Sequence, residues 1–474
     1  MKIKEIVEDS FVVDKFNINE EKEILGFSDD SRRIEKNYIF FAKKGFHSNG
    51  INYAHDAIKN NASCVVSEKN IKNIPLILVN DIHEAEEKIL KKFYNDPVNS
   101  YCFVGITGTK GKTTSSFLVY DYLQKKNANV CYIGTIGIYD KERNQYRNYY
   151  TTPTIYDLYY ILNKLRNNGH DICILEISSH SLIQERIKGL NFEITVFTNL
   201  SHDHLDYHKN MDDYFKAKSR LFFNYQSNLS IINIDDKYGK KLFENINYKK
   251  IGFGLKNYTG KIDYKAFEDG FKILIDKKEY FLNLPGKFNL YNGILSGLII
   301  KNLGFDINGI FLGENGVPGR LEFIEKEGIK IFIDYAHSPD SLEKLLNLLK
   351  IKKEKKLISV FGCTGDRDKG KRPLMGKIAE QFSDYVIITS DDPHGEDPIK
   401  ICRAVKKGFK NKNKCEILVN RKEAIIRAIK KSGKDDIIVI AGKGHETFQI
   451  FDGFELYHND KEVVIYYFND IKEN

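Results

Sequence analysis

The segment that most constrains this chain runs from Tyr101 to Tyr120 and reads YCFVGITGTKGKTTSSFLVY. Its apolar start, Tyr101 to Ile106, is typical of a buried strand, and a helical pattern begins at Ser115 after a glycine-rich turn. Glycines in such a turn let backbone N–H groups close around phosphate oxygens, and the helix N-terminus adds the positive end of its dipole. The segment therefore predicts a phosphate-binding loop between a strand and a helix of an α/β sheet.

Two side chains of this turn suit the phosphates of a nucleotide. Lys112 offers a positive charge to the outer phosphates, and Thr113 offers a hydroxyl group to Mg²⁺. The strict pattern G-x-x-x-x-G-K-[ST] is not met, because Ile106 occupies the position of its first glycine. A plain strand-to-helix turn is therefore the alternative for this segment taken alone.

Length, charge and cysteine usage narrow the class of protein. A chain of 474 residues is too long for one core and suggests about three domains. The net charge of +8 comes from 73 basic and 65 acidic residues, a small surplus that suits anionic small substrates, and no arginine-rich block argues for nucleic acid. The seven cysteines stand singly, which favours reduced thiols, and neither a signal peptide nor a membrane-length apolar run is seen. We expect a cytoplasmic protein that binds neither nucleic acid nor membranes.

The middle of the chain alternates strand and helix patterns, which predicts a mostly parallel sheet. Its strand-like runs span residues 171–177, 192–198 and 229–234. Ligands of open α/β sheets bind outside the carboxyl ends of the strands. Glu176 and His204 follow two of these runs and are therefore candidate metal ligands, with a solvated carboxylate and a loop-capping histidine as the alternatives.

The last third opens near residue 317 and repeats the alternation. Its strand-like runs are residues 329–333, 357–361, 385–389 and 437–440, with a helix expected from Pro339. Each run ends in a charged or glycine-rich loop, so these loops should share one rim of a sheet. Together they favour a binding surface over separate solvated turns.

The first hundred residues carry short strand patterns at 37–42 and 63–67 around a helical pattern at 54–60. Asp30-Ser31-Arg32 and the loop of residues 43–50, which contains His47, could contact a ligand. An ordinary polar loop is the alternative for both. The strand and helix patterns of this part end near Pro97, before the strand of the phosphate-binding loop, and we place a domain boundary there.

Motifs spread over nearly the whole chain make it similar to the Mur ligase family, and within it to the UDP-N-acetylmuramyl-tripeptide synthetases. They are TGTKGKTT at Thr107, TTP at Thr151, EISSHSLIQERI at Glu176, NLSHDHLDYH at Asn199, YFKAKSRLF at Tyr214, FNLYN at Phe288, GRLE at Gly319, DYAHSPD at Asp334, GDRDKGKRP at Gly365 and AGKGHE at Ala441. The unusual loop spacing fits this resemblance, because TGT(K/N)GKT is the usual form in the family.

The resemblance implies an α/β protein of three domains. These would be an N-terminal UDP-substrate-binding domain at 1–98, a central ATP-binding domain with a P-loop-type, mostly parallel sheet at 99–314, and a C-terminal Rossmann-like, amino-acid-binding domain at 315–474. We expect a monomer. Its partners would be UDP-N-acetylmuramyl-dipeptide and an amino acid.

The implied activity is ATP-dependent amide ligation in peptidoglycan synthesis. ATP would phosphorylate the D-Glu γ-carboxylate of UDP-N-acetylmuramyl-L-alanyl-D-glutamate, and the amine of an amino acid would displace phosphate from the acyl phosphate. A carboxylate is a poor acylating agent, so the protein must neutralise phosphate charge and hold the reactants in line. The expected acceptor is a diamino acid, either meso-diaminopimelate or an analogue such as meso-lanthionine, with L-lysine as the alternative.

The resemblance also assigns roles to individual residues. The implied catalytic residues are Lys112, Glu176, His204 and Lys218, and the implied Mg²⁺ ligands are Thr113, Glu176, His204 and Lys218, the lysine being carbamylated by CO₂. The implied ATP contacts are Gly108, Thr109, Lys110, Gly111, Lys112, Thr113, Thr114, Asn292, Arg320 and Asp334. The implied UDP-substrate contacts are Ser31, His47, Thr151, Thr152, Ser178, Gln184 and Arg186. The implied amino-acid contacts are Arg367, Asp392, His394, Gly442 and Glu446.

One motif departs from the family. Members that add meso-diaminopimelate usually carry D-N-P-R, whereas this chain has Asp391, Asp392, Pro393 and His394. His394 replaces a permanent cation, and Asp392 adds a negative charge that would favour an amine over a carboxylate. Against these effects, Arg367 can hold one carboxylate of a diacid and Glu446 an ammonium group.

Two other classes of protein fit part of the sequence. A folate polyglutamate ligase could share the scaffold, but Asp30 to Arg32 and the full-length first domain argue against it. A non-catalytic nucleotide-binding protein would have no need of the implied catalytic residues. The amide ligase is therefore the favoured interpretation.

Overall fold

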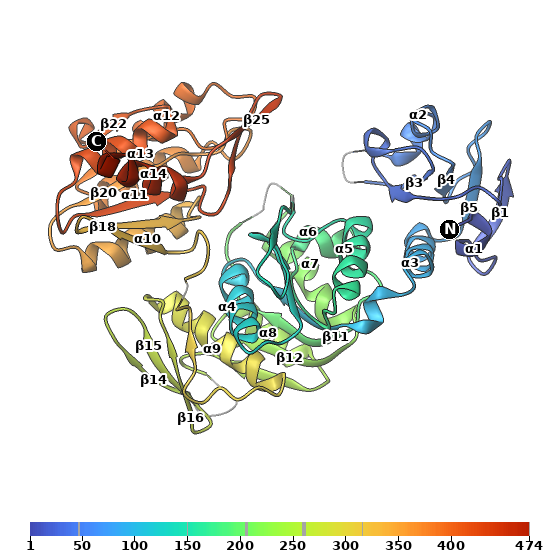
Figure 1. Ribbon diagram of the computed structural model, residues 1–474, viewed down its shortest axis with the longest axis horizontal. Coiled ribbons are helices and arrows are strands. Elements are labelled where there is room, and N and C mark those ends of the chain that lie inside the picture. The colour runs from blue at the N-terminus through green and yellow to red at the C-terminus, as the bar shows by residue number, and fades with distance from the viewer. Residues whose placement is uncertain (46–47, 149, 204–206, 258–261, 315, 474) are drawn as a thin grey trace. The chain divides into compact units, whose positions relative to one another are not determined.

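The computed structural model describes residues 1–45, 48–148, 150–203, 207–257, 262–314 and 316–473 (Figure 1). The chain divides into two compact units. The first comprises Met1–Thr259 and Leu295–Phe305, and the second comprises Gly260–Ile294 and Asp306–Asn474. Within the described ranges, no helix is both long and apolar enough to cross a membrane. The domain boundaries expected after residues 98 and 314 stay predictions.

The N-terminal part of the first unit is built on a five-stranded sheet with the order β1-β5-β4-β3-β2. Its strands are β1 (Val12–Phe16), β2 (Gly26–Ser28), β3 (Tyr38–Phe41), β4 (Cys64–Ser67) and β5 (Leu76–Val79), and its helices are α1 (Ile3–Ile6), α2 (Ala54–Lys59) and α3 (Ile82–Phe93). All neighbours run parallel except β1 and β5. Short 3₁₀ helices lie at Ser31–Arg33, Gly50–Tyr53 and Pro97–Ser100. The strands and the helix predicted in this part are confirmed.

The central part of the first unit is an eight-stranded sheet with the order β13-β12-β11-β6-β10-β7-β8-β9. Its strands are β6 (Cys102–Thr107), β7 (Val130–Gly134), β8 (Gly137–Tyr139), β9 (Gln145–Tyr146), β10 (Ile172–Glu176), β11 (Phe192–Phe197), β12 (Ser227–Asn233) and β13 (Lys250–Phe253). The helices are α4 (Lys112–Lys125), α5 (Ile155–Asn167), α6 (Ser179–Ile183), α7 (Met211–Phe223) and α8 (Lys237–Asn245). The β7–β8 and β8–β9 pairings are antiparallel and the other five are parallel, so the predicted mostly parallel sheet is confirmed.

Helix α4 begins at Lys112, three residues before the predicted start at Ser115, so that prediction was wrong. Gly111 precedes the helix with φ 85°, a left-handed conformation that glycine adopts without strain. Every residue from Thr113 to Leu123 is buried. A helix that is covered on all sides has no amphipathic period to mark where it starts.

The second unit begins with a four-stranded sheet of order β14-β15-β16-β17, followed by a six-stranded sheet of order β18-β19-β23-β20-β21-β22 and the hairpin β24-β25. The strands are β14 (Ile262–Ala266), β15 (Phe271–Ile275), β16 (Lys278–Leu282), β17 (Phe311–Leu312), β18 (Glu322–Lys326), β19 (Ile329–Asp334), β20 (Leu357–Phe361), β21 (Tyr385–Ile388), β22 (Cys415–Ile417), β23 (Ile437–Ala441), β24 (Phe448–Phe451) and β25 (Phe454–Tyr457). The helices are α9 (Lys287–Asn302), whose C-terminal part belongs to the first unit, α10 (Pro339–Lys352), α11 (Lys371–Phe382), α12 (Pro398–Lys406), α13 (Arg421–Lys431) and α14 (Asp460–Glu473), with a 3₁₀ turn at Lys412–Lys414.

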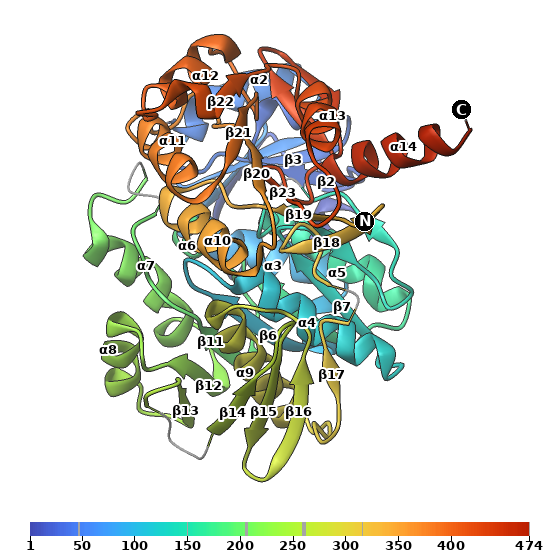
Figure 2. The ribbon, with the colours of Figure 1, turned by 90° about the vertical axis from the view of Figure 1, so that its left-hand side faces the viewer.

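The six-stranded sheet is covered on both faces. Alternate residues of its strands pack against α10, α11 and α12 on one face, and the residues between them pack against α13 and α14 on the other (Figure 2). Strands β19, β23, β20 and β21 run parallel, so their carboxyl ends meet at one rim, as predicted. The expected α/β class is therefore confirmed.

A buried ion pair joins α13 to α14. The Arg421 guanidinium donates to both carboxylate oxygens of Asp460, at 2.8 and 2.7 Å, and both side chains are fully buried. The same guanidinium donates to the Ala441 carbonyl at 3.0 Å, at the end of β23. The start of the last helix is thereby bonded to the rim of the sheet.

A second buried pair lies in the N-terminal part. The Lys43 ammonium lies 2.7 Å from Glu86 of α3 and 3.1 Å from Asp29, and it sits 5.0 Å above the ring of Tyr156 on α5. Burial opposes ionisation of Glu86, yet the Lys43 charge and its neighbours outweigh burial, and the pKa of Glu86 is lowered. The Glu86 side chain is 1% exposed, so its charge depends on Lys43.

Lys43→Met should destabilise the first unit by about 3 kcal/mol, because it leaves the Glu86 carboxylate buried without its cation. Urea unfolding followed by fluorescence or circular dichroism would measure the loss. The matched control is Lys344→Met, which removes an exposed i,i+4 pair with Asp340 and should cost under about 0.5 kcal/mol. Equal losses in the two variants would contradict the structural role of Lys43.

Candidate active site

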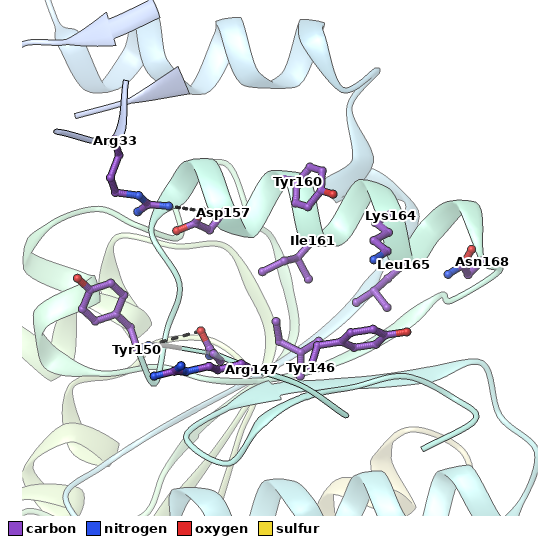
Figure 3. A pocket seen from close by; sticks show the side chains of 12 residues that line it. Arg33, Tyr146, Arg147, Tyr150, Asp157, Tyr160, Ile161, Lys164, Leu165 and Asn168 are labelled. Carbon is purple, nitrogen blue, oxygen red and sulfur yellow. Dashed lines mark hydrogen bonds and ion pairs between the residues drawn. The ribbon is translucent and has the colours of Figure 1, made fainter. Parts of the chain in front are cut away.

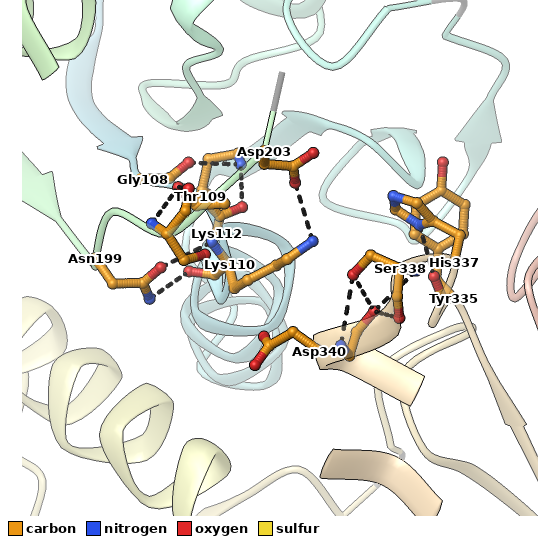
Figure 4. A network of polar contacts seen from close by, with 12 residues as sticks. Gly108, Thr109, Lys110, Lys112, Asn199, Asp203, Tyr335, His337, Ser338 and Asp340 are labelled. Carbon is orange, nitrogen blue, oxygen red and sulfur yellow. Dashed lines mark hydrogen bonds and ion pairs between the residues drawn. The ribbon is translucent and has the colours of Figure 1, made fainter. Parts of the chain in front are cut away.

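The predicted phosphate-binding loop lies between β6 and α4. Gly108 has φ 146°, and a Cβ there would collide with the Thr198 hydroxyl, so this position requires glycine. Asn199, which follows β11, accepts a hydrogen bond from Lys110 N at 3.0 Å through its side chain and one from Thr109 N at 2.8 Å through its carbonyl (Figure 4). The loop is therefore held in shape by the neighbouring strand.

The lysines of the loop point in different directions. Lys112 Nζ donates to the carbonyl oxygens of Gly108 at 2.9 Å and Thr109 at 3.1 Å (Figure 4). Lys110 Nζ lies 3.0 Å from the Asp203 carboxylate. The Lys112 ammonium thus lies against the loop that is expected to carry phosphate, whereas Lys110 forms an ion pair. Thr109, Thr113 and Thr114 are buried.

Glu176 ends β10, next to the loop. It is fully buried, and its Oε2 accepts hydrogen bonds from the Thr113 hydroxyl at 2.9 Å and the Thr135 hydroxyl at 3.1 Å. Its Oε1 accepts from Thr135 N at 3.1 Å and from the Tyr132 hydroxyl. The alternative of a solvated carboxylate is therefore wrong. A hydroxyl and a carboxylate oxygen converge here, which is the donor set that Mg²⁺ prefers.

Lys218 of α7 is 1% exposed and is therefore not a solvated surface lysine. Its Nζ donates to the Gly108 carbonyl at 2.8 Å and lies 4.7 Å from the ring centre of Tyr214. Burial lowers the pKa of Lys218 well below its ordinary value, the charge of Lys112 lowers it further, and Asp203 opposes them. The environment thus favours the uncharged amine.

The predicted metal ligand His204 and the predicted uridine neighbour His47 lie outside the described residues. Within the described part of the chain, no group of three or more His, Cys, Asp or Glu side chains is placed to hold a metal ion. The predicted ligand set has another composition, since it combines one hydroxyl, one carboxylate, one histidine and a modified lysine. The structure brings Thr113, Glu176 and Lys218 to the same loop.

Most of the residues expected to contact the UDP substrate form one connected group in the first unit. Thr152 Oγ1 donates to the Glu176 carbonyl at 2.9 Å and accepts from Ser178 N at 3.0 Å. Arg186 donates to the Thr152 carbonyl at 2.9 Å and to Gln184 Oε1 at 2.8 Å. The Thr151 and Thr135 hydroxyls lie 3.1 Å apart. Ser31 lies in the N-terminal part, where its carbonyl accepts from Asn60 at 2.8 Å.

A cavity of about 680 Å³ lies between α5 and the segment that follows β8 (Figure 3). Its lining includes Arg33, Tyr146, Tyr150, Asp157 and Lys164, and none of its lining residues is a predicted site residue. Figure 3 shows Arg33 reaching Asp157, at 3.2 Å. The cavity is nevertheless linked to the substrate group, because the Arg186 guanidinium lies 4.8 Å from the ring centre of Tyr150.

The remaining predicted ATP contacts belong to the second unit. Asn292 is buried in α9, where its amide donates to Asn289 Oδ1 at 3.1 Å. Asp334 ends β19 and accepts from Leu321 N at 2.8 Å, which holds the turn that carries Arg320. The Arg320 guanidinium lies 4.4 Å from the ring centre of Tyr335.

The rim of the six-stranded sheet holds a buried charge cluster centred on Lys443. Its ammonium is 1% exposed and lies 2.7 Å from Asp392 and 2.6 Å from Glu446. Asp392 also accepts from Ile450 N at 2.9 Å, and Gly442 lies beside Asp391. Asp392 is therefore engaged by a cation of the protein itself. The expectation that its charge would favour an amine of the acceptor stays a prediction. Sequence reasoning did not supply Lys443, which already pairs with this carboxylate.

Glu446 and His394 border the same cluster. Burial raises the pKa of Glu446, although Lys443 offsets part of this effect. The Tyr335 hydroxyl donates to Glu446 at 3.3 Å. His394 has φ 49° and donates its N–H to the Ile450 carbonyl at 3.0 Å, while Arg367 is exposed in the neighbouring loop.

Sequence reasoning missed Lys443, Tyr132 and Thr135. Lys443 stands between two glycines directly after an apolar strand, and a lone cation in this position indicates a functional side chain at the end of a strand. Tyr132 and Thr135 carried no signal, because their partner Glu176 lies more than forty residues away along the chain.

Comparison with known proteins gives the class that this fold and site define. The model of the Mur ligase middle domain matches residues 106–300, and that of the Mur ligase, glutamate ligase domain matches residues 319–444. The chain therefore belongs to the Mur ligase family, and its predicted enzyme class, a ligase that forms an amide bond, is confirmed.

Its relatives carry a more particular name. A protein of Clostridioides difficile (strain 630), named UDP-N-acetylmuramoyl-L-alanyl-D-glutamate--2,6-diaminopimelate ligase, is 40% identical over 455 residues, which cover 92% of this chain and 93% of the relative. A Clostridium acetobutylicum protein of the same name, numbered 1, is 38% identical over 98% of both chains. A solved structure of a protein with this name matches with a TM-score of 0.65 and 30% identity, covering 100% of this chain and 99% of that one.

Proposed function

We propose that this chain joins a diamino acid to the D-Glu γ-carboxylate of UDP-N-acetylmuramoyl-L-alanyl-D-glutamate, with ATP as the energy source. The observation that supports this most directly is the meeting of Lys112, Glu176 and Lys218 at the loop after β6. The preferred acceptor is a diamino dicarboxylic acid, which is the substrate class that the names of its relatives contain. The reaction uses ATP and a UDP-linked precursor, so we expect it to take place in the cytoplasm.

The reaction has two steps. The γ-phosphoryl group of ATP passes to an oxygen of the substrate carboxylate, and ADP leaves. The acceptor amine then attacks the carbonyl carbon, a C–N bond forms, the C–O bond to phosphate breaks, and the amine loses a proton. Both steps move negative charge, so preorganised positive groups lower their barriers.

Lys112 supplies the first of these groups. Its ammonium lies on the loop carbonyls and can turn to the transferring phosphoryl group without leaving the loop. Thr113 and Glu176 fit Mg²⁺ because their oxygens are 2.9 Å apart, and His204 and Lys218 would complete the site. When bound, Mg²⁺ would neutralise charge on the phosphate oxygens.

We propose that Lys218 acts as a carbamate. An uncharged amine reacts with CO₂, and the pKa of Lys218 is lowered by burial and by the Lys112 charge. A carbamate is an anion with two oxygens, which suits a hard cation better than an ammonium group does. Its position at the Gly108 carbonyl would place this anion beside the phosphate-binding loop.

The acceptor pocket is proposed at the rim of the six-stranded sheet. Glu446 would take an ammonium group, and Arg367 and His394 would take the two carboxylates of a diacid. Asp392 does not repel a carboxylate with a full charge, because Lys443 pairs with it at 2.7 Å. This pairing supports a diacid over L-lysine.

Lys112→Ala should lower phosphate release from ATP in the complete reaction by on the order of a hundredfold or more, because a charge on the transferring group is lost. The circular dichroism spectrum should not change. Lys126→Ala, at the exposed far end of α4, is the control and should keep full activity. Near-normal turnover of Lys112→Ala would contradict the phosphate-loop assignment.

Lys218→Ala should be nearly inactive and should regain part of its activity with formate or acetate, which replace the carbamate as an anion. Carbon-13 NMR with labelled bicarbonate should show a carbamate signal in the wild type. The same signal in Lys218→Ala would exclude this lysine as its source.

Acceptor choice can be tested by competition between equal concentrations of meso-diaminopimelate, meso-lanthionine and L-lysine. We expect a diacid to be incorporated, because a pocket that bonds a substrate carboxylate rejects an analogue without it. His394→Arg should improve use of meso-diaminopimelate at pH 8, because it supplies a permanent cation, and His394→Ala should reduce it. Preferential incorporation of L-lysine would overturn the diacid assignment.

A further inference from the structure

Two loops of the second unit carry the groups expected to hold the ends of a diacid. The first, residues 362–370 after β20, contains Arg367, and the second, residues 389–397 after β21, contains His394. We propose that Glu396 and Arg372 form a brace that fixes the separation of these loops, so that the enzyme selects its acceptor by length. This inference rests on the proposed function, since it concerns the acceptor of that reaction.

The centre of the brace is a two-bond contact. Arg372, at the start of α11, donates through Nη1 to Glu396 Oε2 at 3.0 Å and through Nη2 to Oε1 at 2.9 Å. The Arg372 side chain is 3% exposed and that of Glu396 is 18% exposed. Planar pairs of this kind fix direction as well as distance, because the guanidinium fork matches both carboxylate oxygens.

The brace continues into both loops. Glu396 Oε1 also accepts from Asp366 N at 2.7 Å, and the Asp366 carboxylate accepts in turn from Gly395 N at 3.1 Å. Gly365 N donates to the Asp392 carbonyl at 2.8 Å. A Cβ on Gly365 would collide with the backbone of the other loop, so the loops are already in close contact.

The bonded residues are the direct neighbours of the two proposed carboxylate-binding groups. Asp366 precedes Arg367 and has φ 52°, and His394 precedes Gly395 and has φ 49°. Left-handed conformations are uncommon for residues other than glycine, although Asp and His adopt them more readily than most, so the hydrogen bonds between the loops help to keep both residues in place. Hydrogen bonding by Arg372 lowers the pKa of Glu396 to about 2, and its carboxylate therefore stays ionised at any pH used for assay.

A fixed separation has a consequence for the substrate. A diacid whose carboxylates match the distance between Arg367 and His394 can be held at both ends, whereas one with a methylene group more or fewer loses one contact. One methylene in a fitted pocket changes kcat/KM by roughly 10- to 200-fold. Glu396 and Arg372 act as positioning residues here, since they reach the acceptor only through the loops.

The test compares diaminopimelate with its homologues diaminoadipate, one methylene shorter, and diaminosuberate, one methylene longer. Kinetics would be measured on the full-length wild type, Glu396→Gln and Arg372→Lys, each checked for its unfolding midpoint. Glu396→Gln keeps the shape but removes the charge, and Arg372→Lys keeps the charge but removes the fork. The matched control is Glu380→Gln at the other end of α11, where Glu380 accepts from Lys410 N at 2.9 Å and Asn411 N at 2.6 Å.

We expect both brace variants to raise KM for diaminopimelate with little change in kcat, and to lower the preference for diaminopimelate over diaminosuberate by on the order of fivefold. KM for ATP should stay unchanged. Glu380→Gln should keep the wild-type length preference even if its stability falls. If the wild type ligates the diacids and both brace variants keep its length preference, the brace is overturned while the proposed function stands. If the wild type ligates none of the diacids, the proposed function itself is overturned.

Discussion

Two lysine ammonium groups, those of Lys112 and Lys218, donate to one carbonyl oxygen, that of Gly108, and the chemistry of the first unit depends on this meeting. Burial disfavours the charged form of a lysine, and a second cation close by disfavours it further. Lys218 is 1% exposed, and both effects lower its pKa. The backbone positions both groups, because Gly108 is held against Thr198 and accepts no side chain.

Much of the fold follows from patterns that the sequence displays openly. The central strands of parallel sheets are buried on both faces, so they appear as short continuous apolar runs, and β10, β11, β20 and β23 begin and end within a residue of their predicted limits. The start of α4 was missed for the opposite reason, since a helix buried all round shows no period. The local sequence therefore shows where an element begins and ends when its buried residues are bounded by polar, exposed ones.

The candidate site could be predicted only in part, because its contacts join residues that are distant in the chain. Each loop at a strand end was found from its own composition, but the partners of its charges were not. Asp392 is the clearest example: its sequence context suggested a charge open to the acceptor, whereas Lys443, which is 51 residues away, pairs with it. The effect of a buried charge depends on the group that pairs with it. The residue spacing within either motif does not show which charges pair across the edge of the sheet.

The bond between Arg421 and Asp460 gives the end of the chain an unexpected importance. Asp460 is the first residue of the final helix, and Arg421 also reaches the carbonyl just before Gly442. A stop codon at position 460 would remove fewer than a twentieth of the residues. It would nevertheless leave the Arg421 guanidinium buried without its carboxylate partner, beside the proposed acceptor pocket. A frameshift that changes codon 460 would therefore be far more harmful than the small number of altered residues suggests.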